Sequence, residues 1–340
     1  MKSKYFSHVA LVVASLFATT YVASQVPTQR RAVAAAERSI GEWLTRMHDA
    51  SVNSAYVGTF VVSSSSGNLS SSRIWHVCDP SLQVERVETL TGAPRTTFRH
   101  NEQVVTFLPD KRVIRSETHD SMGLFPSLSN DPDPTVAEFY RARRTGSERV
   151  AGFLADIVEF TPKDKLRFGY RIWSEKKTGL VIKLQTLDTD GSVLEQAAFS
   201  ELKFEEPISA QKLASMMTST AGYQVEKQTL IKTTPDIEGW SLKTPVAGFH
   251  TTDCFRRPPP MSADGAPSQS MVQWIFTDGL ASVSLFVEKF DPNRHAQEGL
   301  MAMGATQTLT RRMGGWWLTA VGEVPPKTLL AFAQSIERKK

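Results

Sequence analysis

The residue types that perform catalysis or bind metals do not occur here in the spacings that such sites require. The seven histidines, at positions 8, 48, 76, 100, 119, 250 and 295, form no HExxH motif, and none lies beside a pair of cysteines, so they predict no zinc site. No GxSxG nucleophile elbow, Walker loop or GxGxxG loop is present. The sequence therefore favours a protein without catalytic residues or a cofactor, although missing motifs alone do not exclude an enzyme.

The two cysteines, Cys78 and Cys254, lie far apart in the sequence. In an oxidising compartment they could form one disulfide that joins two domains. The alternative is a pair of small buried thiols, and the sequence alone does not supply the Cα separation that would decide between them.

Arginines form two clusters that could bind phosphate or an acidic peptide. Arg256 and Arg257 precede three consecutive prolines, whose stiff, extended backbone would hold both guanidinium groups at one place on the surface. Together with Asp278, they are our candidates for partner-binding residues. The other cluster, Arg141, Arg143 and Arg144, is explained nearly as well by a solvated helix face.

Residues 1–24 have the pattern of a secretory signal peptide. Lys2 and Lys4 precede an apolar run from Val9 to Val22, and small residues follow. The run is shorter than the ~20 residues of a membrane span, so we expect cleavage rather than anchoring. Cleavage removes two lysines and lowers the formal charge from +4 to +2, which is too small to indicate nucleic-acid binding. We expect a soluble protein in an exported compartment.

The clearest structural pattern covers residues 168–204, which predict three consecutive antiparallel strands. Leu180, Ile182 and Leu184 alternate with other residues, as in a strand with one dry face. Gly179 and Gly191 supply the turns. Seven further strands are expected before this meander, at residues 56–62, 73–78, 82–90, 95–99, 103–108, 112–117 and 150–161.

Few helices accompany these strands: one is expected over residues 40–47 and a short one over residues 135–143. Without crossover helices the sheet should be antiparallel, large and strongly bent. A half-barrel of this kind, if incompletely filled, leaves an apolar cavity suited to acyl chains.

The segment 118–134 is too long for an ordinary hairpin loop and carries apolar residues that a solvent loop would not need. We interpret it either as a mobile flap over the open face of the sheet or as a loop packed into the core. The candidate residues for binding an apolar ligand lie in this segment and on the strands: Tyr56, Phe60, Trp75, Phe107, Leu124, Phe125, Tyr170, Ile172 and Trp173.

A smaller domain is expected after a helix and connector between Ala210 and Thr229. We place the half-barrel domain at residues 25–215, the linker at 216–230 and a small α+β domain at 231–340. The second domain should hold four or so strands, among them 271–277 and 281–290 around the Asp278-Gly279 turn. Residues 295–303 are compatible with a helix, and a final helix should follow Pro325-Pro326.

Several short stretches, in order along nearly the whole mature chain, resemble the periplasmic sigma-E factor regulatory proteins RseB and MucB. The matching stretches are Tyr56-Val57-Gly58-Thr59-Phe60, Tyr170-Arg171-Ile172-Trp173, Leu187-Asp188-Thr189-Asp190-Gly191, Leu194-Glu195-Gln196, Arg256-Arg257-Pro258, Thr277-Asp278-Gly279-Leu280 and Val321-Gly322-Glu323-Val324-Pro325-Pro326. Each stretch alone is weak, but the ordered set is fairly specific.

The resemblance implies a large domain similar to the lipoprotein carriers LolA and LolB, followed by a small C-terminal domain. It also implies binding to the periplasmic part of a membrane anti-sigma factor, protection of that factor from proteolysis, and release when lipopolysaccharide or lipoprotein acyl chains occupy the large domain. A periplasmic lipid or lipoprotein carrier is the alternative, although transport alone would not need the second domain. The sequence leaves a monomer and a homodimer open.

Overall fold

The computed structural model describes residues 37–79, 82–100, 103–118, 125, 133–204, 209–228, 230–258, 270–295 and 297–339. Residues Glu37–Lys340 form one compact unit. The predicted signal peptide and almost all of the segment 118–134 lie outside the described residues. Among the described residues, no helix is long and apolar enough to cross a membrane.

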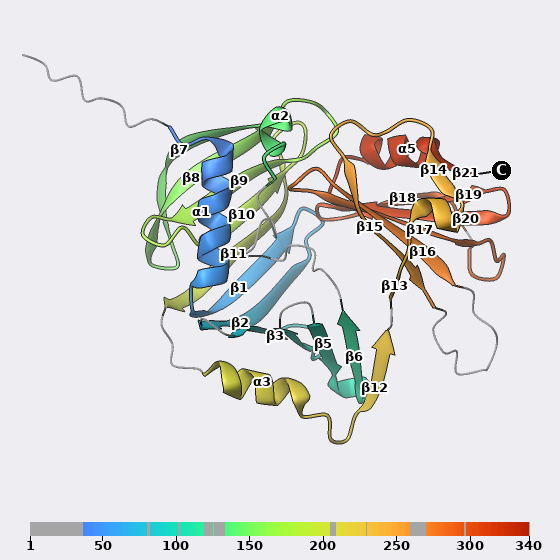
Figure 1. The fold of residues 1–340 in the computed structure, drawn as a ribbon. Coiled ribbons are helices and arrows are strands. Elements are labelled where there is room, and N and C mark those ends of the chain that lie inside the picture. Colours follow the sequence, from blue (N-terminus) through green and yellow to red (C-terminus); the bar gives the residue numbers. More distant parts are fainter. Residues whose placement is uncertain are drawn as a thin grey trace, which may run out of the picture. The chain divides into compact units, whose positions relative to one another are not determined.

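A single sheet contains all of the first twelve strands (Figure 1). Their spatial order is β12-β6-β5-β4-β3-β2-β1-β11-β10-β9-β8-β7, and β7 and β12 are the two edges, so the sheet is not closed. The prediction of a large, open and mainly antiparallel sheet is confirmed. The bounds are β1 (Tyr56–Ser64), β2 (Leu69–Asp79), β3 (Leu82–Thr89), β4 (Thr96–His100), β5 (Gln103–Leu108), β6 (Val113–Thr118), β7 (Tyr140–Val150), β8 (Phe153–Pro162), β9 (Gly169–Glu175), β10 (Val181–Leu187), β11 (Val193–Phe204) and β12 (Gln224–Gln228).

Strand β1 joins the two halves of this sheet. It pairs on one side with β2 and on the other with β11, and both pairings are antiparallel. The predicted meander β9-β10-β11 therefore continues directly into the strands β1 to β6, which precede it in the sequence. The β1–β11 register shifts between Thr59 and Phe60, and such bulges increase the local bend of a sheet.

Helix α1 (Ile40–Asn53) packs on one face of the sheet, across β8 to β10 (Figure 1). Its start is fixed by a capping box, because the Ser39 hydroxyl accepts from the Glu42 amide at 3.3 Å and the Glu42 carboxylate accepts from the Ser39 amide at 2.7 Å. The buried side of the helix and the sheet residues beneath it form one core cluster: Ile40, Trp43, Leu44, Met47, Val136, Tyr140, Val158, Phe160, Tyr170, Ile172 and Val181.

The remaining strands form a seven-stranded sheet of order β13-β15-β16-β17-β20-β19-β18 and a pair, β14-β21. Helix α5 (Pro326–Ser335) supplies Leu329, Phe332 and Ala333 to the core of this part. The predicted small α+β domain is confirmed in its class. The bounds are β13 (Ile231–Lys232), β14 (Trp240–Leu242), β15 (His250–Arg257), β16 (Met271–Thr277), β17 (Ser282–Lys289), β18 (Gly299–Met303), β19 (Thr306–Met313), β20 (Trp316–Gly322) and β21 (Ile336–Arg338).

Two expected helices differ from the structure. Helix α2 (Val136–Phe139) is a single turn, and the arginine cluster that follows it lies on strand β7, paired along its length with β8. Residues 299–303 are strand β18, paired with β19. In both cases pairing with the next strand overrides a local helical pattern. The helix expected after Ala210 is confirmed as α3 (Ala210–Thr218), and in the connector that follows it β12 pairs in parallel with β6. The short helices η1 (Pro109–Lys111) and α4 (Pro235–Glu238) complete the fold.

Candidate functional site

Three phenylalanines from distant parts of the chain meet on the large sheet. Phe60 of β1 and Phe199 of β11 are cross-strand partners, with ring centroids 6.2 Å apart. The ring of Phe125 lies 5.4 Å from that of Phe60 and 5.1 Å from that of Phe199. Phe125 is the one described residue between 119 and 132, and it packs against the sheet. We call Phe60, Phe125 and Phe199 the aromatic trio.

The predicted ligand-binding residues do not all converge on this trio. Tyr56, Phe60 and Trp173 belong to one core cluster, and Phe125 packs against it. Tyr170 and Ile172 belong to the cluster under α1. Phe107 packs with Phe98, Met217 and Tyr223 in a third cluster, and Trp75 stacks with Arg73 and Arg86. Leu124 lies outside the described residues.

Ile172 and Trp173 point to opposite faces of the sheet. Ile172 is paired with Val158 and Leu184, whereas Trp173 is paired with Ile157 and Lys183. The Trp173 indole donates to the Glu148 carboxylate at 2.6 Å, and the Lys183 ammonium lies 4.1 Å from its ring centroid. A charge at Ile172 would disrupt the fold, because its side chain is fully buried against α1.

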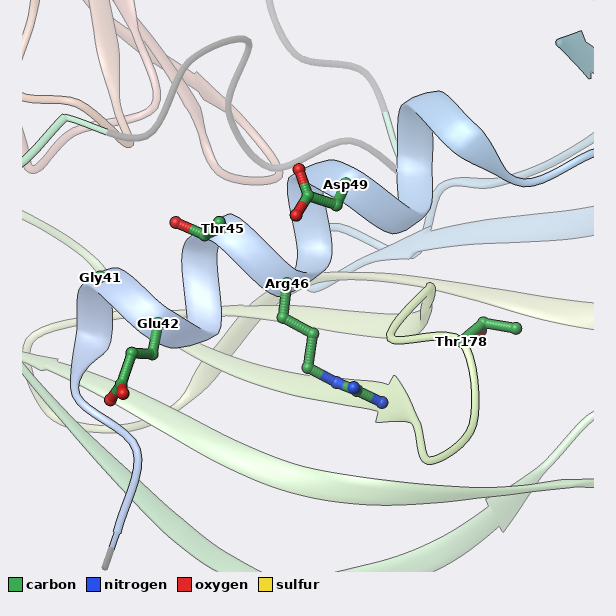
Figure 2. Close-up of a pocket in the computed structure, with 6 residues that line it drawn as sticks. All are labelled: Gly41, Glu42, Thr45, Arg46, Asp49 and Thr178. Atoms are coloured by element: carbon green, nitrogen blue, oxygen red, sulfur yellow. The ribbon is translucent and has the colours of Figure 1, made fainter. Parts of the chain in front are cut away.

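A hollow of about 610 Å³ lies where α1 meets the β9–β10 turn (Figure 2). Most of its lining residues are polar in type, and none of the predicted residues belongs to it. Arg46 extends toward the turn and donates to the carbonyls of Glu175 and Lys176 at 3.3 and 2.7 Å. Because these contacts attach the helix to the sheet, we interpret the hollow as part of the packing between α1 and the β9–β10 turn, not as a ligand site. Its lining residues are Gly41, Glu42, Thr45, Arg46, Asp49 and Thr178.

Arg256 and Arg257 do not present a joint surface. They are consecutive residues of β15, so their side chains leave opposite faces of the strand. The Arg256 guanidinium forms an ion pair with Glu238, with Nη2 and Oε1 2.8 Å apart, and remains 44% exposed. Arg257 donates to Gln273 at 2.7 Å, and burial lowers its pKa. Arg256 is therefore the more accessible of the two.

Asp278, the third predicted partner-binding residue, is not on the surface in this structure. Its side chain is fully buried, and it forms an ion pair of 2.8 Å with Arg167, which is also fully buried. It accepts from the Tyr140 hydroxyl at 3.1 Å and from the amides of Leu280 and Ala281 at 3.0 and 2.7 Å. A carboxylate held in this way is unavailable to a partner.

Sequence reasoning missed Arg167 altogether. It lies between β8 and β9 in a polar stretch, Lys163-Asp164-Lys165, which has the composition of a solvated loop. Its guanidinium is placed between the rings of Phe139, 4.3 Å away, and Phe249, 5.0 Å away. No local pattern marks such a residue, because its partners come from elsewhere in the chain.

Burial has the largest influence on the pKa values of Asp278, Tyr140 and Tyr170. It raises the pKa of Asp278, against the opposing effect of the turn amides and the Arg167 charge. Burial also raises the pKa values of Tyr140 and Tyr170 well above their usual value, with nearby Asp278 adding to the effect. Both phenols therefore stay protonated at neutral pH, and the Tyr140 hydroxyl donates to Asp278.

The two cysteines are not joined by a disulfide. Cys254 is buried on β15 in the core of the smaller sheet, whereas Cys78 lies on β2 of the large sheet. Burial raises the pKa of the Cys254 thiol to about 12, so it is neutral and unreactive at physiological pH. In this structure Cys254 fits the alternative of a small buried thiol, whereas Cys78 is only partly buried. Within the described ranges no three histidine, cysteine, aspartate or glutamate side chains cluster to hold a metal ion.

Both the large-sheet part and the smaller part of the chain match known protein families. The model of the MucB/RseB N-terminal domain matches residues 39–217, and the model of the MucB/RseB C-terminal domain matches residues 234–337. The chain belongs to the MucB/RseB family. This membership confirms the resemblance that the sequence suggested.

Two curated relatives and one solved structure illustrate the similarity. The chain is 29% identical to the sigma factor AlgU regulatory protein MucB of Pseudomonas aeruginosa, over 87% of this chain and 90% of that protein. It is 26% identical to the sigma-E factor regulatory protein RseB of Salmonella typhimurium, over 99% of this chain and 98% of that protein. A crystal structure of MucB in complex with MucA(peri) aligns with a TM-score of 0.66 at 27% identity, covering 88% of this chain and 98% of that one.

Proposed function

We propose that this protein is a periplasmic negative regulator of an envelope-stress sigma factor. In this role it binds the periplasmic part of a membrane anti-sigma factor and protects it from proteolysis. Acyl chains of lipopolysaccharide or of stray lipoproteins reach the large sheet and cause release. It performs no catalysis in this scheme.

The observation that carries the proposal is the match of both family models, in order, over nearly all of the described chain. A solved relative, MucB, was crystallised in complex with MucA(peri), and that structure covers 88% of this chain. A carrier of lipids alone would need the large sheet but not the second one, so the two-part architecture favours a protein that also binds a macromolecular partner.

The aromatic trio supports the acyl-sensing part. Phe60 and Phe199 belong to the sheet, while Phe125 comes from the long segment that we interpreted either as a flap or as a loop packed into the core. An acyl chain that enters here replaces the Phe125 ring on the two sheet rings, exchanging one apolar contact for another at little cost. Binding of the ligand is thereby coupled to the position of Phe125.

Arg256 is the better candidate for partner contact. Its guanidinium is 44% exposed and pairs with Glu238, whose carboxylate is 8% exposed. A carboxylate of an acidic partner peptide can share this guanidinium, because its five donors exceed what one carboxylate uses. Asp278 is not included in this surface.

A pull-down tests partner binding directly. The mature chain is immobilised and exposed to periplasmic extract and to the purified periplasmic domain of the cell's own anti-sigma factor. We expect retention of that domain, and reduced retention when lipopolysaccharide is added. No retention in either experiment would refute the regulatory function, whereas retention that acyl ligands leave unchanged would refute the sensing part alone.

A variant pair tests the trio. Phe125→Asp puts a charge where the acyl chain would lie, and because Phe125 is only partly buried the fold should survive. Leu154→Asp, at a residue that is 46% exposed on β8, is the matched control. We expect calorimetric binding of lipopolysaccharide to weaken at least tenfold in the first variant and to stay unchanged in the second; equal binding by both would place the acyl site elsewhere.

A further inference from the structure

The buried group around Asp278 links two stretches that belong to different sheets. Arg167 comes from the β8–β9 loop of the large sheet, and Asp278 from the β16–β17 turn of the smaller one. Arg167 also pairs with Asp164 on its own loop and donates to the Ala247 carbonyl, before β15, at 2.6 Å. Each charge is thus compensated, as buried ions require. We call Arg167, Asp278 and Tyr140 the joint.

Two glycines show how closely the chains approach at the joint. A Cβ atom added to Gly248 would lie 1.9 Å from the Arg167 Nη2 atom, and one added to Gly279 would lie 2.4 Å from a Val136 methyl carbon. Both glycines have positive φ, +78° and +93°, which other residues rarely adopt. In addition, the Thr328 hydroxyl of α5 donates to the Leu166 carbonyl at 2.6 Å. At both glycines the backbone therefore lies so close to side chains of the other part that no Cβ atom would fit.

Tyr140 belongs to the joint and to the core of the large sheet at the same time. Its hydroxyl donates to Asp278, while its ring packs in the cluster under α1, 6.3 Å from the ring of Tyr170. Phe125 packs against that same cluster, and Leu280, two residues after Asp278, does so as well. Phe125 thus packs against the same cluster as the ring whose hydroxyl donates to the turn of the smaller sheet.

We propose that the Tyr140 hydroxyl transmits occupation of the aromatic trio to the β16–β17 turn, so that the joint loosens when an acyl chain displaces Phe125. The proposal rests on the proposed function, because it assigns the route by which ligand binding changes the partner-binding part. The mechanism needs no large movement. If the Tyr140 ring follows the relaxing core, Asp278 loses a donor inside a buried site, which makes its buried carboxylate costlier and so favours opening of the turn that holds it.

The amides of Leu280 and Ala281 report on the joint without any partner, since both donate to Asp278. Hydrogen exchange of these amides is measured in the mature protein with and without lipopolysaccharide, and lipopolysaccharide binding is measured in parallel by calorimetry. In the wild type we expect binding to accelerate their exchange about fivefold or more, within the usual range of coupling between sites.

Two variants test whether the Tyr140 hydroxyl transmits ligand binding to the turn or only stabilises it. Tyr140→Phe keeps the ring and removes the hydroxyl, so exchange at both amides should be fast already without ligand and should rise less than twofold on binding. Tyr223→Phe, in the separate cluster around Phe107, should behave as the wild type. Calorimetric affinity for lipopolysaccharide should stay within about twofold in both variants, since neither hydroxyl belongs to the trio.

Three results would overturn the proposal. If the wild type binds lipopolysaccharide but hydrogen exchange at the Leu280 and Ala281 amides is unchanged, the joint does not respond to the ligand. That result would leave the proposed function in place. A Tyr140→Phe variant that responds like the wild type would show that the hydroxyl transmits nothing. Failure of the wild type to bind lipopolysaccharide at all would remove acyl sensing and, with it, this route.

Discussion

Two arginine–carboxylate pairs in this protein have similar shortest distances and opposite surroundings. Arg167 and Asp278 lie 2.8 Å apart with both side chains fully buried, whereas Arg256 and Glu238 lie 2.8 Å apart with the arginine 44% exposed. An exposed pair contributes little to stability because water and salt screen it. A buried pair is costly to break, because the remaining charge has no compensation. The buried pair should therefore matter for folding, and the exposed one for binding.

Removing the buried cation should have the largest effect. Arg167→Met leaves Asp278 buried without its cation, and we expect a loss of about 3–5 kcal/mol in the free energy of unfolding. Denaturant unfolding measures it. The double variant Arg167→Met with Asp278→Leu should recover much of the loss, because no charge then remains inside. A single variant as stable as the wild type would mean that the pair is hydrated in solution.

The Gly248→Ala substitution should cause the second-largest loss in the free energy of unfolding. Gly248→Ala forces a methyl group against Arg167 and Phe139 at a positive φ, and we expect a loss of about 2–4 kcal/mol. Gly191→Ala is the matched control, since its φ is +87° and nothing lies within 4 Å of the added atom; its cost should be about 1 kcal/mol. Equal losses in the free energy of unfolding for the two variants would show that a methyl group fits at Gly248 beside Arg167 and Phe139.

Tyr140→Phe should have a smaller effect on stability. It removes one hydrogen bond to a buried carboxylate and keeps the packed ring, which predicts a loss of about 1–2 kcal/mol. Thermal unfolding would reveal it, with Tyr223→Phe as the reference. A loss as large as that of Arg167→Met would mean that the hydroxyl, and not the arginine, compensates Asp278.

The exposed pair should show the smallest change in stability. The Glu238 carboxylate is only 8% exposed, but the glutamine amide can still donate to it, so Arg256→Gln is expected to lower the free energy of unfolding by about 1 kcal/mol. Its effect should appear in the affinity for the anti-sigma domain, which we expect to weaken roughly three- to tenfold, more at low salt than at high salt. A large loss of stability with unchanged affinity would reverse the roles assigned to the two arginines.

Much of the large sheet could be predicted because its information is local. The glycines at the turns mark β9 to β11 within forty residues of chain, and the structure has all three strands. The expected alternation of buried and exposed residues does not hold, because Val181 is as buried as Leu180 and Ile182. The amphipathic pattern of α1 was equally readable. The failures were strands whose pairing the local pattern did not show: β7 and β18 pair with the strands that follow them, and β12 pairs with β6, far away in the sequence.

The candidate site was less predictable for the same reason. Phe60 and Phe125 could be named from size and position, but Phe199 could not be singled out before its pairing with β1 was known. Asp278 was read as a surface residue because Asp-Gly turns are usually exposed, and Arg167 was overlooked because lysines surround it. Burial of a charge depends on the tertiary partners that compensate it, and a sequence does not display them.

The central claim is that an acyl ligand on the large sheet releases the anti-sigma factor. The most direct measurement is a titration of lipopolysaccharide into the complex of the mature protein with the fluorescently labelled periplasmic domain of that factor, followed by anisotropy. The account predicts a saturable fall in anisotropy with the wild type and a curve shifted to at least tenfold higher lipopolysaccharide with Phe125→Asp. Anisotropy that stays constant while calorimetry shows bound lipopolysaccharide would contradict it.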